Sequence, residues 1–417
     1  MTRYLMYWEL IGFHTSSDST KRATRHRARD FLATRALHVR SRSTFRHRPP
    51  LSVQYLYFRK GLEVDPVSWR AEKSGETGPD QHGERTMLHR RVDFLNENFD
   101  LLNLAKFGPV ENVKVVIVVQ VHNRPNYLAN LIDSLRQTKG IEETLLVFSH
   151  DINVSPVNEL IRNITCFKYI IRLICKYSRM FSQDKTQETV QSDWERKRKA
   201  LSSKCKNAEH PDKYGNYRVA KITQIKHHWW WKMNYVFDGV FDRYGLSNAW
   251  VLLLEEDHYV VPDALYILTD IIRNKQKYCE DCEIIALGSY LQSFSQYGST
   301  IANLGAHPWY SSRHNMGMAF RRESWLKVKN CSELFCKYDD YNWDWSLMQV
   351  VAKCLPKPFR VVFTKSPRVI HIGDCGLHTH RCNAHNTYMS ILSIMAKHAD
   401  LLFPSRLIVS DKTCLLS

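Results

Sequence analysis

The chain has 417 residues, 44% of them hydrophobic, which is enough to bury one large core and favours one catalytic domain with an N-terminal extension. The formal net charge is +17, but residues 1–60 hold 13 Lys/Arg against three Asp/Glu, so the rest of the chain is only mildly basic. We therefore expect no nucleic-acid partner, although an acidic surface could still attract the basic segment.

Residues 1–87 are expected to form a solvated stem or linker. The basic run KRATRHRARDF has little apolar periodicity, and EKSGETGPDQHGER lacks large apolar residues. No stretch reaches the roughly 18 to 20 apolar residues that span a bilayer, so the sequence shows no membrane anchor or secretory signal. The catalytic domain is predicted to cover residues 88–417.

The first predicted elements form a strand-helix-strand unit of the Rossmann type. Residues 113–120 are nearly all β-branched, which is typical of a parallel strand buried on both faces. Asn123 is a candidate cap for a helix that starts near Pro125. The helix shows apolar residues at helical spacing, and a second strand covers residues 145–148.

Polar residues gather where these two strands end, and ligands of such folds bind at that edge. These side chains can hydrogen-bond a uracil and a ribose, and Arg124 can face a phosphate. The residues are Gln120, His122, Asn123, Arg124 and Asp151. No GxGxxG or GxxxxGK[ST] motif is present, which argues against dinucleotide oxidoreductases and P-loop enzymes. Taken alone, these residues could instead only cap the elements.

A dense patch follows at Gln224-Ile-Lys-His-His228 and Trp229–Trp231. Its residues could contact a ligand, or they could form the core face of a helix with two incidental histidines.

Residues 250–254 predict another buried strand, which runs directly into Glu255, Glu256, Asp257 and His258. Three consecutive acids at the open end of a strand repel one another, and a divalent cation that bridges nucleotide phosphates would relieve this repulsion. We take Asp257 as the first metal ligand. A helix beginning near Pro262 is expected to pack behind the strand.

Eight of the eleven cysteines follow Tyr278 at close spacings. Disulfides in an oxidising compartment are favoured over a zinc site, because CEDC followed about fifty residues later by Cys-x4-Cys does not fit common zinc spacings. Three Asn-x-Ser/Thr sequons, at Asn153, Asn163 and Asn330, are compatible with a luminal location.

Residues 339–345, DDYNWDW, combine three acids with three aromatic residues. Apolar walls raise the pKa of a carboxylate and make it a better base, and indole rings suit the CH face of a sugar. Asp344, between Trp343 and Trp345, is therefore a candidate base, although aromatic runs usually pack in cores. His371, on a short predicted strand before a glycine turn, is the candidate second metal ligand, and this pair suits manganese.

Seven segments occur in an order that closely resembles the N-acetylglucosaminyltransferase II family: VVQVHNRPNYL, VFSHD, QIKHHWWWK, LLLEEDHYVVPD, HNMGMAF, YDDYNWDW and HIGDCGLH. The likeness covers roughly residues 88–412. It implies an α/β fold of GT-A type, with a Rossmann-like, mostly parallel central sheet flanked by helices. It also implies manganese, a type II protein of the Golgi membrane with a luminal catalytic domain, and β-1,2 transfer of N-acetylglucosamine from UDP-GlcNAc to the α-1,6-arm mannose of an N-glycan, with inversion.

The resemblance also assigns residues. Donor contacts fall to Gln120, Val121, His122, Asn123, Arg124, Asp151, Gln224, Ile225, Lys226, His227 and His228. The metal falls to Asp257 and His371, the base to Asp344, and the acceptor side to Asn315, Trp343 and Trp345. The implied disulfides are Cys279–Cys282, Cys331–Cys354 and Cys375–Cys382.

Two departures leave an alternative open. Phe294 stands near the place of a donor-binding arginine of the family, and the usual distant partner of Cys336 is absent. A catalytically impaired, lectin-like relative that only binds sugar or nucleotide-sugar is therefore the alternative.

Overall fold

The computed structural model describes residues 90, 92–98, 100–175, 197–198, 201–202, 220–289, 294–339, 342–373 and 384–412. The predicted stem, Cys375 and Cys382 lie outside this range. The chain divides into two units between Gly75 and Glu76, and the second unit holds every described residue. Among the described residues, no helix combines the length and apolarity that a membrane crossing requires.

A ten-stranded sheet forms the centre of this unit, in the order β1-β4-β3-β2-β5-β9-β7-β10-β8-β12. In chain order its strands are β1 (Leu101–Leu102), β2 (Val115–Val121), β3 (Leu145–His150), β4 (Lys168–Ile174), β5 (Trp250–Glu255), β7 (Ile284–Ala286), β8 (Asn303–Pro308), β9 (Met318–Arg321), β10 (Arg360–Thr364) and β12 (Ile408–Lys412). The four neighbours β4, β3, β2 and β5 pair in parallel. The prediction of an α/β fold with a Rossmann-like, mostly parallel sheet flanked by helices is confirmed.

The predicted strand-helix-strand unit is present as β2, α3 (Pro125–Gln137) and β3. The strand β2 is buried on both faces, which explains why its residues are apolar without alternation. One detail of the prediction is wrong: the residue before the helix is Arg124, not Asn123, and it makes no side-chain cap. Pro125 sets the helical φ and has no N–H to satisfy, so the first turn needs less from a capping side chain.

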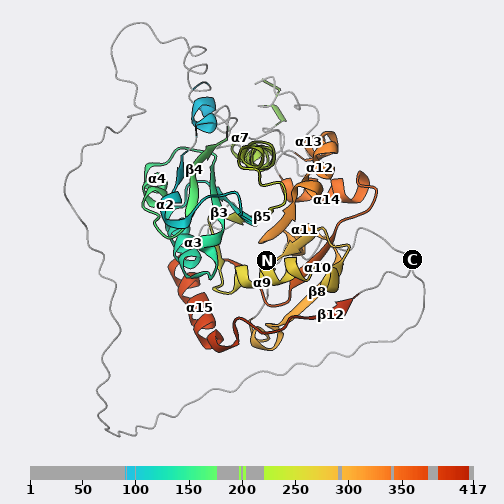
Figure 1. The fold of residues 1–417 in the computed structure, drawn as a ribbon. Coiled ribbons are helices and arrows are strands. Elements are labelled where there is room, and N and C mark those ends of the chain that lie inside the picture. Colours follow the sequence, from blue (N-terminus) through green and yellow to red (C-terminus); the bar gives the residue numbers. More distant parts are fainter. Residues whose placement is uncertain are drawn as a thin grey trace, which may run out of the picture. The chain divides into compact units, whose positions relative to one another are not determined.

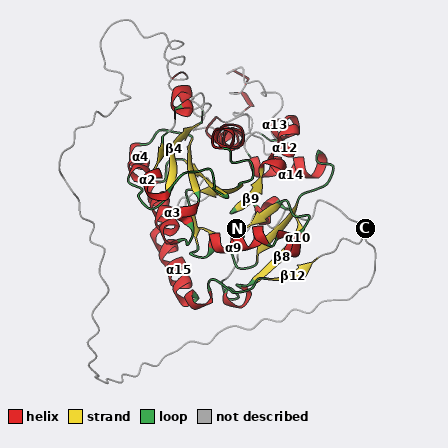
Figure 2. Ribbon diagram, in the orientation of Figure 1, coloured by secondary structure: helices red, strands yellow, loops and turns green. Residues whose placement is uncertain are grey.

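Helices cover both faces of the sheet and make three layers (Figures 1 and 2). Apolar residues of the strands alternate between the two faces, so each face has its own core. One core is shared with α3, α4 (Ser155–Arg162), α9 (Ala264–Arg273) and α10 (Lys275–Cys279). The other is shared with α7 (Ala220–Asn234), the π-helical turn η2 (Tyr235–Val240), α8 (Phe241–Tyr244), α12 (Arg322–Asn330), α13 (Ser332–Tyr338) and α14 (Trp343–Lys353).

A separate two-stranded antiparallel sheet pairs β6 (His258–Val260) with β11 (Val369–His371). Its register sets His371 opposite His258. Because β6 begins three residues after the end of β5, this pairing brings a distant part of the chain to the end of the central sheet.

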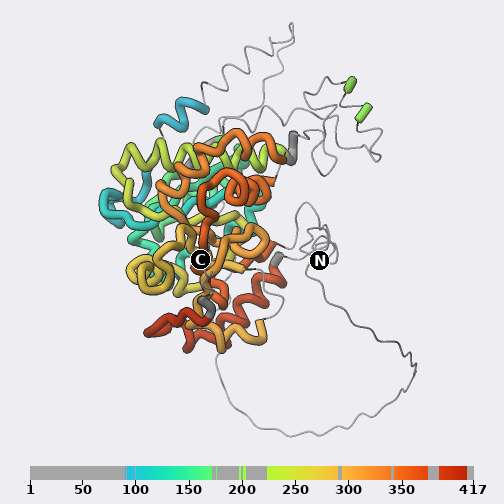
Figure 3. Tube along the Cα trace, turned by 90° about the vertical axis from the view of Figure 1, so that its right-hand side faces the viewer, coloured from blue at the N-terminus to red at the C-terminus, as the bar shows by residue number. Residues whose placement is uncertain are grey.

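The remaining elements are short, except for one C-terminal helix. They are α2 (Leu104–Phe107), α11 (Ser311–His314), the 3-10 turns η1 (Ile141–Glu143), η3 (Gly298–Thr300) and η4 (Ala399–Leu401), and α15 (Ala384–Lys397). The helix α15 packs beside α3, where the hydroxyl of Tyr388 donates to Asp133 at 3.2 Å. Figures 1 and 3 show α15, in red, at the opposite end of the unit from residues 92–97, in blue.

Candidate active site

The site lies where the order of the parallel strands reverses. Along the sheet, β3 and β4 lie on one side of β2 while β5 lies on the other. Ligands of open α/β sheets bind at the carboxyl ends of the strands at such a switch point. Here Gln120 of β2 lies directly beside Glu255 of β5, and Asp151 follows β3. Val121 is fully buried in β2, and its backbone oxygen accepts from the N–H of Asp151 at 3.3 Å, so neither its side chain nor its backbone is exposed in this structure.

Asp151 organises the β3 side of this edge. Its carboxylate accepts from Nδ1 of His122 at 2.7 Å and from Nε2 of Gln224, on α7, at 3.1 Å. Burial acts to lower the pKa of His122, but the hydrogen bond and the charge of Asp151 raise it overall. A protonated His122 has its second N–H free to donate, which suits an anionic or oxygen-rich ligand. Asn123, the next residue, is exposed.

Glu256 is buried and holds the loop that follows β2. Its two carboxylate oxygens accept from the backbone N–H of His122 at 2.8 Å and from Nε of Arg124 at 2.7 Å. A terminal nitrogen of Arg124 donates to Asp257, also at 2.7 Å. Arg124 was expected to face a phosphate, and in the structure its guanidinium pairs with these two acids.

Asp257 and His371 meet at the junction of the two sheets, as expected for a pair of metal ligands. Nε2 of His371 lies 3.1 Å from Oδ2 of Asp257. Burial acts to raise the pKa of Asp257, but the hydrogen bond and charge of His371 and the charge of Arg124 hold it well below its ordinary value. The pKa of His371 is raised, because the contact with Asp257 outweighs burial.

The residues around this pair fit a cation. Oδ1 of Asp257 is buried and has no hydrogen-bond partner within the described residues. A Cβ at Gly373 would lie 2.1 Å from Oδ2 of Asp257 and 2.9 Å from Nε2 of His371, so only glycine leaves these atoms accessible. Glu255, Asp257 and His258 also each offer a ligand atom within 4.8 Å of one another. Carboxylate and imidazole donors of this kind suit manganese.

The repulsion among the three acids does not by itself require a metal. Arg124 pairs with both Glu256 and Asp257, and the buried Lys232 of α7 lies near Glu255, whose charge opposes the lowering of the Lys232 pKa to about 7 by burial. The expectation of a cation therefore depends on the open oxygen of Asp257 and on Gly373 rather than on the repulsion.

One face of the helix α7 packs in the core and another reaches the site. The two interpretations offered by the sequence, a ligand contact and a core face, therefore apply to different faces of this helix. Trp229 packs in the core, whereas the fully buried His228 contacts the hydroxyl of Ser149, at the end of β3, through Nε2 at 2.8 Å. Lys226 points elsewhere, because its ammonium donates to the backbone oxygens of Phe335, at 2.6 Å, and of Asp339. Ile225 and His227 are half-buried.

The candidate base Asp344 lies in the first turn of α14. Its Oδ2 accepts from the hydroxyl of Ser311, on α11, at 2.9 Å. Burial raises the pKa of Asp344 overall, although Ser311 and nearby backbone N–H groups act in the opposite direction. Trp343 stacks on Trp229 at 4.7 Å and so belongs partly to the core, while Trp345 is half-buried.

Asn315 lies on the loop between α11 and β9. This loop follows α11, which carries Ser311, and continues into Met316 and Gly317. The backbone oxygens of those two residues accept from the N–H groups of Gly288 and Leu287. A Cβ at Gly317 would lie 2.7 Å from the side chain of Val369, two residues before His371. Oδ1 of Asn315 is buried without a partner in the described chain, which leaves it available to a ligand.

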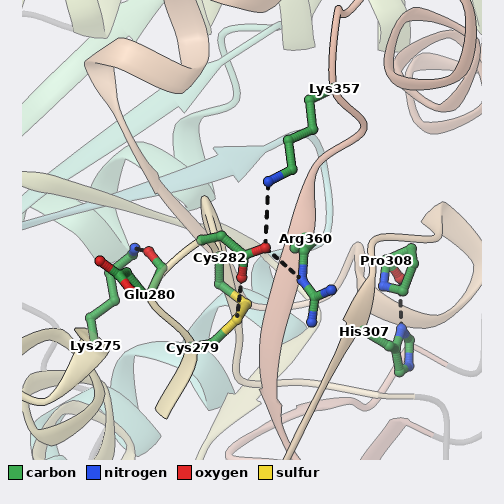
Figure 4. The surroundings of a disulfide bond; sticks show 9 residues. Lys275, Cys279, Glu280, Cys282, His307, Pro308, Lys357 and Arg360 are labelled. Carbon is green, nitrogen blue, oxygen red and sulfur yellow. Dashed lines mark hydrogen bonds and ion pairs between the residues drawn. A yellow bond between two sulfur atoms is a disulfide. The ribbon is translucent and has the colours of Figure 1, made fainter. Parts of the chain in front are cut away.

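Two of the three expected disulfides involve described residues, and both are present: Cys279–Cys282 and Cys331–Cys354. Figure 4 shows the surroundings of the first, with Lys357 and Arg360 nearby. Asp281, between the two cysteines, pairs with Arg360, the first residue of β10, at 3.2 Å and with Lys357 at 3.6 Å. Cys336 is exposed and forms no disulfide in the structure.

Phe294, which stands where the family has an arginine, packs on Tyr297 with ring centroids 5.8 Å apart. Its partly buried ring lies against the apolar cluster around β6 and β11. It is therefore a packing residue.

The sequence analysis included Glu256 only as one of a run of acids, and it did not single out Lys232, Ser311 or Gly373. Lys232 had a detectable signal, because it follows Gln224 and His228 at intervals of four on one helix. The other three depend on contacts between distant segments, for which the sequence contains no local pattern.

Comparisons with known proteins cover almost the whole described unit. Residues 89–416 match the family model for N-acetylglucosaminyltransferase II. The α-1,6-mannosyl-glycoprotein 2-β-N-acetylglucosaminyltransferases of Rattus norvegicus and Homo sapiens are 40% and 38% identical to this chain. These matches cover 76% and 80% of this chain and 72% and 75% of the relatives. The Arabidopsis thaliana enzyme is 33% identical over 70% of this chain and 65% of its own length.

Two solved structures are more distantly similar. S. aureus TarS 1-349 in complex with UDP-GlcNAc is 13% identical, with a TM-score of 0.32 and coverage of 69% of each chain. The mannosyltransferase PcManGT from Pyrobaculum calidifontis, in complex with GDP-Man and Mn2+, is 9% identical, with a TM-score of 0.30 and coverage of 76% of this chain and 72% of its own.

Proposed function

This chain belongs to the N-acetylglucosaminyltransferase II family, and from that membership we propose that it transfers N-acetylglucosamine from UDP-GlcNAc to the α-1,6-arm mannose of an N-glycan. The observation that carries the proposal is the family match over residues 89–416, which includes every residue of the candidate site. Its relatives in mammals and plants are named for this same transfer.

We propose that the donor nucleotide binds at the switch point between β2 and β5. His122 is held by Asp151, whose hydrogen bond and charge raise the pKa of the imidazole and so favour its protonated form, and it would donate to the ribose or the diphosphate. Gln224 supports the same carboxylate from α7, so the imidazole is already oriented before the ligand arrives.

Asp257 and His371 would hold manganese, and the support is the open Oδ1 of Asp257 together with the space that Gly373 leaves. When bound, this ion would neutralise charge on the departing UDP. Glu256 keeps Arg124 beside Asp257, which adds a positive charge at the same place.

Asp344 is the proposed base, supported by its place beside Ser311 and by its raised pKa. It would take the proton of the mannose 2-hydroxyl while that oxygen attacks the anomeric carbon from the face opposite UDP. The new C–O bond forms as the bond to the diphosphate oxygen breaks, so the centre inverts and a β-1,2 linkage results. A single displacement requires no covalent intermediate and no second catalytic carboxylate.

Manganese dependence, inversion and a luminal position at the Golgi membrane are parts of the proposal. The two disulfides support the location, because disulfides persist in oxidising compartments.

The test is an assay of the purified chain with UDP-GlcNAc, MnCl2 and a mannose-terminated biantennary N-glycan. The expected product carries one β-1,2-linked N-acetylglucosamine on the α-1,6 arm, and chelation by EDTA should stop its formation. A folded preparation that binds UDP-GlcNAc without turnover would contradict the proposal and favour the lectin-like alternative.

A further inference from the structure

Three polar side chains of α7 form a row across the ends of two strands. Gln224, His228 and Lys232 follow one another at intervals of four residues and so lie on one face of the helix. Gln224 donates to Asp151 and His228 contacts Ser149. Lys232 donates through Nζ to Oε1 of Gln120, at the end of β2, at 2.5 Å. Each of the three side chains of α7 therefore contacts a different residue at or next to the carboxyl ends of β2 and β3.

Lys232 is an unusual member of this row because it is almost fully buried, with 1% of its surface exposed. A buried lysine is costly to keep charged, so burial lowers the pKa of Lys232 to about 7, while the negative charge of the neighbouring Glu255 acts in the opposite direction. Lys232 plays no part in the transfer chemistry proposed above. Within the described residues, the side chain of Lys232 makes one hydrogen bond, to Gln120. The effect of this contact on the orientation of the Gln120 amide is therefore the role to consider.

The chemistry of this contact decides which end of the Gln120 amide faces a ligand. In its ammonium form, which the charge of Glu255 favours, Lys232 has only N–H donors and no acceptor, so it selects the carbonyl oxygen of the amide rather than its NH2 group. That choice fixes the flip of the amide. Nε2 of Gln120 then has no hydrogen-bond partner among the described residues, and it is not a buried atom. Gln120 thus presents two N–H donors at the switch point.

We propose that Lys232 is a positioning residue that holds Gln120 in the orientation in which its NH2 group donates to a carbonyl oxygen of the uracil ring. This inference rests on the proposed function, since it assumes a uridine nucleotide at the β2–β5 edge. Uracil offers two carbonyl oxygens as acceptors, and the fixed amide offers only donors. Without Lys232 the amide could flip, and its oxygen would then meet those acceptors.

The test compares UDP with inorganic pyrophosphate, each with MnCl2, by isothermal titration calorimetry. Gln120→Glu is the sharpest variant, because a carboxylate keeps the size and the contact with Lys232 but has no N–H to donate. We expect it to remain folded and to lose about tenfold in UDP affinity, the effect of one hydrogen bond, with a smaller loss of pyrophosphate affinity from the added negative charge.

Lys232 itself is tested by a double-mutant cycle with Gln120. Lys232→Met should lower UDP affinity by about threefold to tenfold. Lys232→Met combined with Gln120→Met should lose no more than Gln120→Met alone, because Lys232 acts through Gln120. Manganese binding, followed by electron paramagnetic resonance, should not change.

Other results would overturn the inference. Equal losses of affinity for UDP and pyrophosphate would mean that Lys232 acts through Glu255 on the phosphate side. Additive losses in the double variant would mean that Lys232 does not act through Gln120. If Lys232→Met does not fold, unchanged UDP affinity in Gln120→Glu still rejects the idea. If the wild-type protein itself binds no UDP, the proposed function fails instead.

Discussion

Nε2 of His371 lies 3.1 Å from Oδ2 of Asp257, although the two residues come from strands that are far apart in the chain. The pairing of β11 with β6 produces this contact, because it sets His371 opposite His258 just after the end of β5. Asp344, the proposed base, lies on another element, in the first turn of α14.

Gly373→Ala should disrupt the metal site without touching a ligand residue. The new Cβ would lie 2.1 Å from Oδ2 of Asp257, so the carboxylate must move. We expect at least a tenfold loss of manganese affinity, by electron paramagnetic resonance, and a matching loss of transfer. The control is Gly239→Ala, where the nearest atom is a Tyr235 carbon at 3.4 Å. Normal manganese binding in Gly373→Ala would remove this pair as the metal site.

Asp344→Asn should abolish turnover and spare the donor. The amide keeps the size of the side chain and the contact with Ser311, but it cannot accept a proton. General base catalysis contributes roughly 10²- to 10⁴-fold, so kcat should fall by about that factor. UDP affinity, measured by calorimetry, should stay within about twofold. A near-normal kcat would exclude Asp344 as the base.

Ser311→Ala should shift the pH dependence of transfer. The hydroxyl of Ser311 stabilises the ionised form of Asp344, so its removal raises the pKa of that carboxyl further. The base must be ionised to act, so activity is lost as pH falls through its pKa. The acid limb of kcat/KM should therefore move to higher pH in the variant. Ser312→Ala, at the exposed neighbour, is the control and should leave the profile unchanged.

Asp263→Asn should destabilise the fold that supports β6 and β11. Asp263 and Arg368 form a fully buried ion pair with contacts of 3.0 and 3.1 Å. Removing one charge leaves the other buried and uncompensated, which costs about 3 to 5 kcal/mol of unfolding free energy. Urea denaturation measures the loss. Glu333→Gln breaks the exposed pair with Lys337 and should leave the free energy of unfolding nearly unchanged, because water screens this pair. Equal effects would show that burial of the first pair is not what matters.

The two disulfides should differ in their effect on stability. Cys331–Cys354 closes a loop with a sequence separation of 23, whereas Cys279–Cys282 has a separation of 3. On the chain-entropy model, Cys331→Ser/Cys354→Ser should lose about 3 kcal/mol, and Cys279→Ser/Cys282→Ser less. Thermal and urea unfolding of the two double variants compare them directly. A larger loss from the shorter loop would contradict the entropic explanation.

Local patterns were sufficient to predict three neighbouring strands of the central sheet, β3, β2 and β5. The unbroken β-branched run of β2 and the apolar residues 250–254 of β5 indicate strands that are buried on both faces. Pro125 marks the start of α3. These signals are readable because burial and backbone geometry act on residues close together in sequence. They also place polar residues such as Gln120 and Asp151 at one edge of the sheet.

Only the tertiary structure decided what those polar residues do. The acids after β5 look alike in sequence, yet Glu256 holds the loop of His122 and Arg124, and Asp257 keeps a free oxygen beside His371. Lys232 and Ser311 acquire roles only because α7 and α11 pack against distant segments. Hydrogen bonds and desolvation depend on positions in space, and residues far apart in the chain leave no shared periodic pattern from which such contacts could be predicted.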